Sequence, residues 1–512
     1  MNRRELILAG AAALGGAAAA GTAPEPRRPN IVLFMVDDMG WQDTSVPLWE
    51  RETPFNGLYR TPGMERLASG GMAFTNAYAA GPVCTPTRVS MMTGWSPART
   101  HVTNWTLRPG TDTSGKHPDL LPPDWNMGGL SNSADTACAC AAPSLPALLR
   151  GAGYRTIHVG KAHFGAIGTP GAEPRNLGFD VNIAGHAAGA PGSYLAREGY
   201  GRGLANKERA WDVPGLEKYI GMGAFLTEAL TQEAVAAVDW AIADGKPFFL
   251  NMAHYAVHVP FAPDERFMGR YTRAGVNRTE AMYASLLEGM DRSLCDLLDL
   301  LDRRGIADNT LVVFASDNGG LSAHGRGGRP HTHNAPLNSG KGSAYEGGVR
   351  VPMLSRWPGK VAAGTRCHAP VITQDLFATF LRASGVRGAS DAVRAGDGRD
   401  ITPLLRRTGS LPASRPLLWH YPHVWGVAGP GIHPYSAVRS GDWKLVYFHS
   451  EPRYELFNLA EDIGEVRDLS AADPRRTRRM ADLLRHELER CGAQMSIRRS
   501  DGRAVALPGG RA

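Results

Sequence analysis

The chain has 512 residues, of which 43% are hydrophobic and 21% charged. This composition is typical of a globular protein and excludes a disordered or fibrous chain. The length favours more than one structural unit. The formal net charge is +7, but the basic residues are scattered, and the densest group, Arg475–Arg490, has the pattern of a solvent-facing helix. We therefore expect no nucleic-acid partner, and the positive balance weakly favours an anionic substrate.

The first 23 residues have the pattern of a signal peptide. Arg3 and Arg4 precede an apolar stretch from Leu6 to Ala20, and small residues follow. This stretch is too short for a membrane span, and no other segment is apolar enough for one. The paired arginines are similar to a twin-arginine signal, while ordinary secretory export stays open. We expect an exported protein, periplasmic or extracellular, with no membrane span.

Four apolar segments, each followed by polar residues, indicate buried strands of a parallel sheet. Helical patterns lie between them: one covers Leu145–Arg150, and a longer one runs from about Glu280 to Arg304, with Thr279 as N-cap and Gly305 as C-cap. Alternating strands and helices predict an α/β fold with a large, mainly parallel sheet flanked by helices. The polar residues should then meet beyond the carboxyl ends of the strands. The predicted strands are Asn30–Val36, Thr156–Val159, Phe248–Met252 and Leu311–Ala315.

The chain divides into a linker and two folded parts. Residues 24–29 form a Pro-rich and Arg-rich linker, and residues 30–410 form the main domain. Within it, residues 101–142 are a long loop, which in a compact domain is usually functional. Residues 411–505 predict a smaller α+β subdomain. Its expected elements are two strands between Ser436 and Tyr447, a third at Tyr454–Asn458, and a helix at Pro474–Arg490.

Two of the predicted strands end in oxygen-bearing side chains. Asp37 and Asp38 follow the first strand, and Asp317 and Asn318 follow a later one. Three carboxylates and an amide oxygen suit Ca²⁺ or Mg²⁺ better than zinc. Such residues also punctuate strand ends as turns and caps, but the same placement at two strand ends favours a metal site.

One of the six cysteines stands in a specific pattern, Cys84-Thr-Pro-Thr-Arg88. Pro86 suits the first turn of a helix that Gly94 would end. Cys84 would then sit at the helix N-terminus, where the dipole favours a negative group. A lone cysteine is usually a small buried hydrophobe. Cys, Pro and Arg at this fixed spacing are much more specific.

This pattern, C-x-P-x-R, resembles the hallmark of type I sulfatases in the alkaline phosphatase superfamily. Thr87 stands where many members have serine, at a tolerant position of the motif. Further segments resemble family motifs in the same order, so the resemblance covers nearly the whole chain after the signal peptide. These segments are residues 30–40 (NIVLFMVDDMG), 160–163 (GKAH), 256–260 (AVHVP), 316–319 (SDNG) and 340–352 (GKGSAYEGGVRVP), with tail segments around Trp443-Lys444 and Glu455–Asn458.

The resemblance implies a fold, a cofactor set and residue roles. The fold would be alkaline phosphatase-like with a smaller C-terminal subdomain. A formylglycine-generating enzyme would convert Cys84 to formylglycine, and one Ca²⁺ would be bound by that residue together with the oxygen ligands of the two strand ends. Arg88, Lys161 and Lys341 would neutralise the transferring group. The implied metal ligands are Asp37, Asp38, Cys84, Asp317 and Asn318.

The resemblance also implies the reaction. The hydrated aldehyde of residue 84 would attack sulfur through one hydroxyl and form a covalent sulfo-enzyme. His258 would protonate the leaving alcohol, and His163 would take the proton of the second hydroxyl, so that sulfate is expelled. The expected enzyme is a sulfuric ester hydrolase. Two alternatives stay open: a phosphonate monoester or phosphodiester hydrolase, and a non-catalytic protein that binds sulfated glycans.

Taken together, these motifs resemble those of bacterial sulfatases that act on aryl esters or on polysaccharides such as carrageenans and glycosaminoglycans. We therefore expect a sulfated saccharide as substrate. The segments 104–108 (NWTLR) and 419–425 (WHYPHVW) offer aromatic platforms for sugars or interior packing. His254 fits either a supporting position behind the site or the core. Three further histidines precede Lys341 and fit sugar contact or exposure: His324, His331 and His333.

Overall fold

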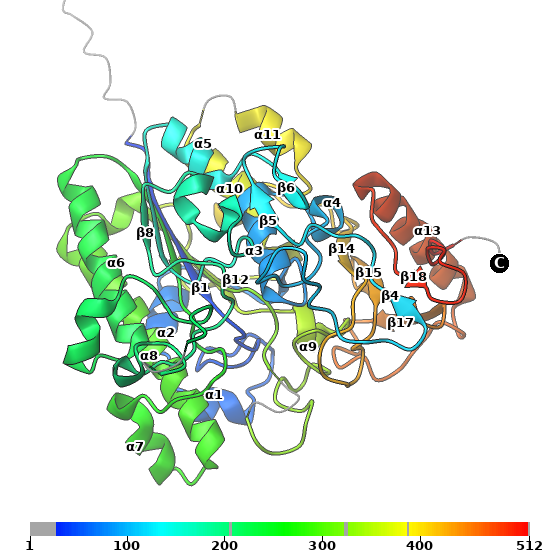
Figure 1. Ribbon diagram of the computed structural model, residues 1–512, viewed down its shortest axis with the longest axis horizontal. Coiled ribbons are helices and arrows are strands. Elements are labelled where there is room, and N and C mark those ends of the chain that lie inside the picture. The colour runs from blue at the N-terminus through cyan, green and yellow to red at the C-terminus, as the bar shows by residue number, and fades with distance from the viewer. Residues whose placement is uncertain (1–26, 204–206, 322–325, 387–388, 510–512) are drawn as a thin grey trace, which may run out of the picture.

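A computed structural model describes residues 27–203, 207–321, 326–386 and 389–509. The predicted signal peptide and His324 lie outside the described residues. A mixed eight-stranded sheet runs through the larger part of the molecule (Figure 1), in the order β12-β2-β11-β10-β1-β9-β7-β8. Its strands are β1 (Asn30–Val36), β2 (Met72–Phe74), β7 (Arg155–Gly160), β8 (Val181–Ile183), β9 (Phe248–Ala253), β10 (Thr310–Ser316), β11 (Met353–Arg356) and β12 (Thr365–Cys367).

The five strands from β10 to β8 are parallel, and β11 runs antiparallel to both β10 and β2. This arrangement confirms the predicted α/β class with a mainly parallel sheet. The four predicted strands are present, and all except β1 are longer than expected by one residue at one or both ends.

Helices cover both faces of the sheet because its central strands are apolar on both sides. In β1, Val32 and Phe34 pack into one buried cluster, while Ile31 and Leu33 pack into the other. Figure 1 shows α6 and α8 on one side of β1, and α5 and α10 on the other. The first face carries α2 (Pro62–Ser69), α6 (Leu226–Ala243), α7 (Glu265–Arg273) and α8 (Arg278–Arg303), and the second carries α3 (Cys84–Thr93), α5 (Leu145–Gly151), α10 (Asp375–Ala383), α11 (Ala389–Ala395) and α12 (Thr402–Leu405).

The long helix α8 begins two residues earlier than predicted. Asn277, rather than Thr279, is its N-cap, and the Asn277 side chain accepts a hydrogen bond from the backbone of Glu280. The helix ends at Arg303 with Arg304 as C-cap, and Gly305 follows with a φ of 64°. An Asn side chain is as good a cap as Thr, so the sequence offered two competing starts.

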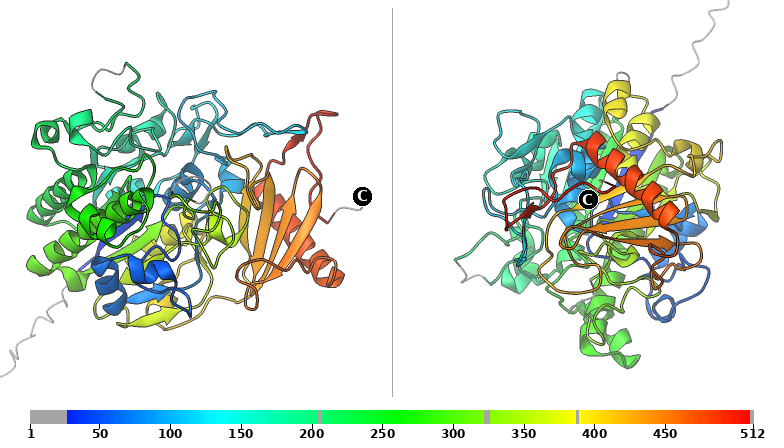
Figure 2. Two further views of the ribbon diagram at one scale, coloured as in Figure 1. Left: turned by 90° about the horizontal axis from the view of Figure 1, so that it is seen from below. Right: turned by 90° about the vertical axis from the view of Figure 1, so that its right-hand side faces the viewer.

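The C-terminal part is a four-stranded antiparallel sheet with α13 on one face (Figure 2). The other face packs against the larger part of the molecule, where Trp419 meets Tyr78 edge to face. Buried charges join the two parts, since Lys444 lies 2.9 Å from Glu346 and 2.8 Å from Glu465. The elements are β14 (Leu417–Tyr421), β15 (Tyr435–Ser440), β16 (Trp443–Phe448), β17 (Arg453–Asn458) and α13 (Pro474–Cys491).

Strand β14 was not predicted, and it changes the interpretation of the 419–425 segment. Trp419 and Tyr421 belong to this strand and are buried in the core between the two parts. They are therefore not an exposed platform for sugars. The sequence of this segment fits both a buried strand and a sugar-binding surface, because the two use the same residue types.

The remaining elements are short, and residues 101–142 are mostly loop, as expected. Among the described residues, no helix combines the length and the hydropathy needed to cross a bilayer. The short elements are α1 (Pro54–Leu58), α4 (Pro97–Thr100), α9 (Glu346–Val349), the pairs β3 (Ala77–Tyr78) with β13 (Val371–Ile372), β4 (Leu120–Leu121) with β18 (Ile497–Arg498) and β5 (Gly129–Ser131) with β6 (Ala139–Ala141), and the 3₁₀ turns Pro170–Ala172, Pro174–Leu177, Ala196–Glu198, Glu217–Met222 and Ala307–Asn309.

Candidate active site

The site lies at the carboxyl ends of β1 and β10. These strands are parallel neighbours, and Val36 is in register with Ser316. The pairs Asp37-Asp38 and Asp317-Asn318 therefore leave the sheet at the same level. The backbone N–H of Asp38 donates to Asp317 Oδ1 at 3.3 Å, and Asn318 Nδ2 donates to Asp38 Oδ1 at 2.7 Å. Parallel pairing thus brings together side chains 280 positions apart.

Cys84 is the first residue of helix α3 and faces the cluster of carboxylates at these strand ends. Val83 is the extended N-cap, and Gly94 ends the helix in the left-handed conformation, as predicted. Cys84 Sγ lies 3.6 Å from Asp37 Oδ1 and 3.4 Å from Lys341 Nζ. Burial raises the pKa of the Cys84 thiol to about 12, against the opposing effect of Lys161 and Lys341. The thiol is therefore neutral at pH 7 and a poor nucleophile as it stands.

Three buried cations pair with the three buried carboxylates. Arg88 Nε lies 2.8 Å from Asp317, Lys161 Nζ 2.5 Å from Asp37, and Lys341 Nζ 2.6 Å from Asp38. All six side chains are almost completely buried, and unpaired charges there would cost several kcal/mol each.

The carboxylates also repel one another. Burial and the neighbouring Asp317 raise the pKa of Asp37 to about 8. For Asp38, burial acts in the same direction, but Lys341 and His258 outweigh it and hold the pKa below its usual range. Carboxylates gathered so closely are typical of a site that takes a further cation.

The donor atoms fit a hard divalent cation. Among the described residues, Asp38 Oδ2 and Asn318 Oδ1 are buried without a hydrogen-bond partner. Ligand atoms of Asp37, Asp38, Cys84 and His258 lie within 4.8 Å of one another. Orphaned buried oxygens are costly, and oxygen donors of this kind suit Ca²⁺. The residues present therefore match the requirements of such an ion.

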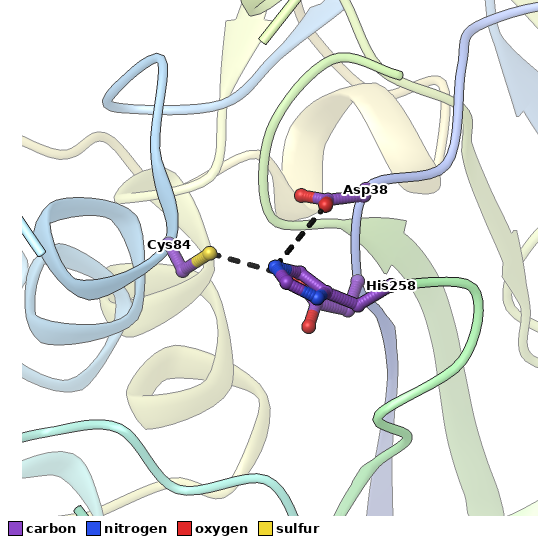
Figure 3. Close-up of side chains that lie close together, drawn as sticks. Asp38, Cys84 and His258 are labelled. Carbon is purple, nitrogen blue, oxygen red and sulfur yellow. Dashed lines mark hydrogen bonds and ion pairs between the residues drawn. The ribbon is translucent and has the colours of Figure 1, made fainter. Parts of the chain in front are cut away.

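His258 lies between Asp38 and Cys84, as Figure 3 shows. Its Nδ1 is 2.6 Å from the carbonyl of Val259, and its Nε2 is 3.4 Å from Asp38 Oδ2. Burial lowers the pKa of His258 to about 3, although Asp38 opposes this shift. The resting imidazole is neutral, with Nδ1–H donating to Val259 and the Nε2 lone pair facing the site.

His163 lines the same site and is held by the 101–142 loop. Its Nε2 is 2.8 Å from the carbonyl of Thr106 and donates to it. Its Nδ1 is buried without a partner among the described residues and is therefore a free acceptor. Burial and the nearby Lys161 hold the pKa of His163 well below its usual range, so the ring is neutral and able to take a proton.

The other histidines named from the sequence lie elsewhere. His254 is buried in the core, where Nε2 is 2.9 Å from Ser293 Oγ and the ring packs against Phe34. Neither His331 nor His333 lines the cavity described below. Both residues are half-buried, and sugar contact and exposure both stay open for them.

A cavity of about 520 Å³ opens above Cys84. The predicted side chains on its floor are Cys84, His163, His258 and Lys341. Among the residues named as platforms, Trp105 and Trp425 line its walls. The walls also include Arg202, Trp211 and Leu321, which sequence reasoning missed because they lie in irregular segments without a motif. The remaining lining residues are Gly189, Ala190, Pro191, Gly192, Val259 and Pro260.

The site combines buried cations around a neutral cysteine with two neutral histidines that line the same cavity. This arrangement suits an enzyme that acts on an anionic ester. The family model described as "Sulfatase" matches residues 29–386, and the model described as "N-sulphoglucosamine sulphohydrolase, C-terminal" matches residues 340–494. The chain therefore belongs to the sulfatase family, and it is a sulfatase, an enzyme that hydrolyses sulfate esters.

Individual relatives agree with this assignment. The chain is 34% identical over 418 residues to N-acetylgalactosamine-6-sulfatase of Mus musculus, covering 79% of this chain and 70% of the relative. It is 28% identical to a protein named "Sulfatase" of Formosa agariphila, covering 88% and 85%. The solved structure of Ps i-CgsB in complex with k-i-k-neocarrahexaose has 28% identity and a TM-score of 0.70, covering 90% and 93%.

The glycine at position 189 generates a prediction, because it leaves space for the His163 ring. A Cβ at Gly189 would lie 2.2 Å from His163 Cε1. We expect Gly189→Ala to displace the ring and lower kcat/KM by about 10²-fold, since displacements of about 1 Å have effects of this size. Steady-state kinetics with any hydrolysed sulfate ester measures the effect.

The matched control is Gly221→Ala, since nothing lies within 4 Å of a Cβ at that position. It should leave both the kinetics and the melting temperature unchanged. Equal activity of the two variants would show that turnover does not depend on the position of the His163 ring.

Proposed function

We propose that the protein removes O-sulfate groups from a sulfated saccharide, with Cys84 converted to formylglycine. The observation that carries this proposal is the buried thiol at the floor of the cavity, surrounded by Arg88, Lys161 and Lys341. These cations match the charge of a sulfate group, while the neutral thiol does not match the nucleophile that the reaction needs. The similar proteins support a saccharide, since one is named an N-acetylgalactosamine-6-sulfatase and another was solved in complex with a neocarrahexaose.

The conversion would be a two-electron oxidation of the Cys84 side-chain carbon to an aldehyde. The carbon–sulfur bond breaks, the sulfur leaves as sulfide, a carbon–oxygen double bond forms, and the formylglycine-generating enzyme supplies the oxidant. The hydrated aldehyde provides two hydroxyls on one carbon: one to attack sulfur and one to drive release of sulfate. The environment of Cys84 supports this role, since Lys341 Nζ and Asp37 Oδ1 lie 3.4 and 3.6 Å from its Sγ. They are placed to hold oxygens on the same carbon.

His258 would protonate the alcohol that leaves. Its Nε2 faces the site, and its resting pKa of about 3 reflects burial more than charge. An arriving sulfate group brings negative charge next to the ring and raises this pKa, so the proton is acquired together with the substrate. The proton then moves to the bridging oxygen as the sulfur–oxygen bond breaks.

His163 would complete the turnover. After sulfuryl transfer, residue 84 holds one sulfate ester and one hydroxyl on the same carbon. His163 Nδ1, which is buried without a partner among the described residues, would take the hydroxyl proton. The carbon–oxygen double bond then forms, the bond to sulfate breaks, and water rehydrates the aldehyde. Thr106 fixes the tautomer that leaves Nδ1 free.

We infer that Ca²⁺ completes the site. Asp37, Asp38, Asp317 and Asn318 would hold it together with residue 84, and the orphaned oxygens of Asp38 and Asn318 support this set. When bound, the ion would lower the pKa of a hydroxyl and neutralise charge. Arg88 and Lys161 would remain on Asp317 and Asp37, which they contact at 2.8 and 2.5 Å.

We propose that the protein acts outside the cytoplasm, in the periplasm or extracellular space. This proposal is supported by Arg3, Arg4 and the apolar stretch that follows them. The Cys84 side chain would be modified before folding is complete, because it is only 3% exposed in the folded chain.

The direct test is sulfate release from sulfated mono- and oligosaccharides after co-production with a formylglycine-generating enzyme, with Ca²⁺ present. We expect release by the wild type and none above background by Cys84→Ala, because the nucleophile is lost. If no sulfate ester is cleaved despite a verified aldehyde at position 84, phosphonate monoester and phosphodiester hydrolysis become the better assignment. If position 84 remains a thiol and the sugars bind without turnover, a non-catalytic glycan-binding protein becomes the better assignment.

Removing the metal should destabilise the protein. Treatment with a chelator leaves the repulsion among Asp37, Asp38 and Asp317 unrelieved, so we expect a lower melting temperature that Ca²⁺ restores. Ca²⁺ at 100 times its Kd should add about 2.7 kcal/mol of stability. Calorimetric titration of Ca²⁺ should show Asp38→Asn binding more weakly, with the exposed Asp391→Asn as control. A melting temperature that is unaffected by chelation would contradict the metal site.

The His258 role predicts a dependence on the leaving group. His258→Ala should lower kcat/KM for sugar sulfates by about 10²–10⁴-fold. Hydrolysis of 4-nitrophenyl sulfate should fall far less, because nitrophenolate leaves without a proton. Equal losses on the two substrates, measured by sulfate release, would show that His258 does not act as the acid.

A further inference from the structure

We propose that Arg202 and Arg108 form a second anion-binding subsite beside the cavity, so that the preferred substrate carries a second negative group near the scissile sulfate. This inference rests on the proposed function, because it describes the sugar bound in the same cavity. Arg202 is a cation of the cavity wall, whereas Lys341 lies on the floor with Cys84. Arg202 therefore reaches the part of the substrate that does not react.

The position of Arg202 is fixed by an aromatic ring. Its guanidinium lies over the Trp211 ring, 5.3 Å from the centroid, and Trp211 lines the same cavity. Stacking on Trp holds the planar group in one orientation and leaves its edge available for hydrogen bonds. The Arg202 side chain is 47% exposed, so a ligand can reach it.

A second hollow lies near this wall. Arg108, His186, Lys207 and Arg209 line it, together with Glu208. Glu208 joins it to the cavity wall, because its carboxylate lies 3.4 Å from Arg108 and 3.1 Å from Arg202. Glu208 lines the second hollow and contacts Arg202 of the cavity wall, so the two hollows are linked by this ion pair.

The charges of this region do not balance. Four cations, Arg108, Arg202, Lys207 and Arg209, lie here, and the carboxylates among them are Glu208 and Asp212, with Arg209 2.7 Å from Asp212. Such an excess beside an apolar cavity attracts a ligand with more than one negative charge.

Glu208 occupies the place of the second anion in the free protein. Its carboxylate contacts both arginines, and the three side chains are 45–52% exposed. Exposed ion pairs of this kind contribute little to stability, so an incoming sulfate or carboxylate can compete with Glu208 for the two arginines. A sulfate group offers three oxygens to the two guanidinium groups, which favours bidentate contacts.

Binding to the Cys84→Ala variant tests the inference independently of turnover. Isothermal titration calorimetry would compare three disaccharides: one with a single sulfate, one with a second sulfate on the neighbouring sugar, and one with a single sulfate next to a uronate. We expect the two dianionic sugars to bind at least about tenfold more tightly than the monosulfated one. The stronger of the two identifies the second group.

The arginine variant is decisive. Adding Arg202→Ala should weaken binding of the dianionic sugars far more than binding of the monosulfated one, whereas the exposed Arg197→Ala should have no effect. Glu208→Gln should tighten binding of the dianionic sugars, because their competitor has lost its charge. Equal affinities for all three sugars, or equal losses on all three with Arg202→Ala, would overturn the proposal.

Failure of the proposed function is distinguishable from failure of this subsite. If the mature wild type cleaves no sulfate ester but the dianionic sugars still bind more tightly, the subsite stands and the reaction is wrong. If sulfate is released with no preference for dianionic sugars, the reaction stands and the subsite is wrong.

Discussion

Burial of three carboxylates beside three cations is the constraint on which the rest of the structure depends. Each of Asp37, Asp38 and Asp317 has its own partner at 2.5–2.8 Å. Removing either member of such a pair would leave an uncompensated buried charge. The cluster forms only when three parts of the fold come together. The strand ends supply the carboxylates, helix α3 supplies Arg88, and a loop supplies Lys341.

The surrounding fold fixes this cluster from several directions. Asp43, five residues beyond Asp38, accepts a hydrogen bond from the Gly40 backbone at 2.9 Å and contacts the fully buried Arg326 at 2.9 Å. Arg326 is enclosed by aromatic rings, including Tyr283 at 4.1 Å. Trp425, a residue of the cavity wall, packs against Gly342, where a Cβ would lie 2.5 Å from the ring, so the absence of a side chain allows the close approach. The C-terminal part thus contributes a cavity wall and is not only an appendage.

Much of the fold and of the site was predictable because both depend on local patterns. Continuous apolar strands ending in Asp37-Asp38 and Asp317-Asn318 indicated both a parallel sheet and the edge at which side chains would converge. The start of α8 was misplaced because Asn277 and Thr279 are equivalent caps. Strand β14 was missed because its residues also suit a binding surface, and only the packing of Trp419 against Tyr78 decides between the two.

The residues of the cavity walls could not be predicted from the sequence, for a different reason. Arg202 and Trp211 lie in irregular chain, where no periodicity predicts the direction of a side chain. Their contact with the site depends on how long loops fold over the sheet, which is a tertiary property. The orphaned atoms Asp38 Oδ2 and Asn318 Oδ1 likewise became visible only once the strands were placed. Substrate selection is therefore the least predictable part of this protein.

The central claim is that residue 84 carries two hydroxyls, one to attack sulfur and one to release sulfate. The Cys84→Ser variant separates these tasks, because a serine supplies only the first. Intact-protein and peptide mass spectrometry after incubation with a hydrolysed sulfate ester is the most direct measurement. The account predicts a stable sulfate ester at position 84, formed once without turnover. Continued sulfate release by this variant would contradict it, as would a serine that stays unmodified while the substrate is bound.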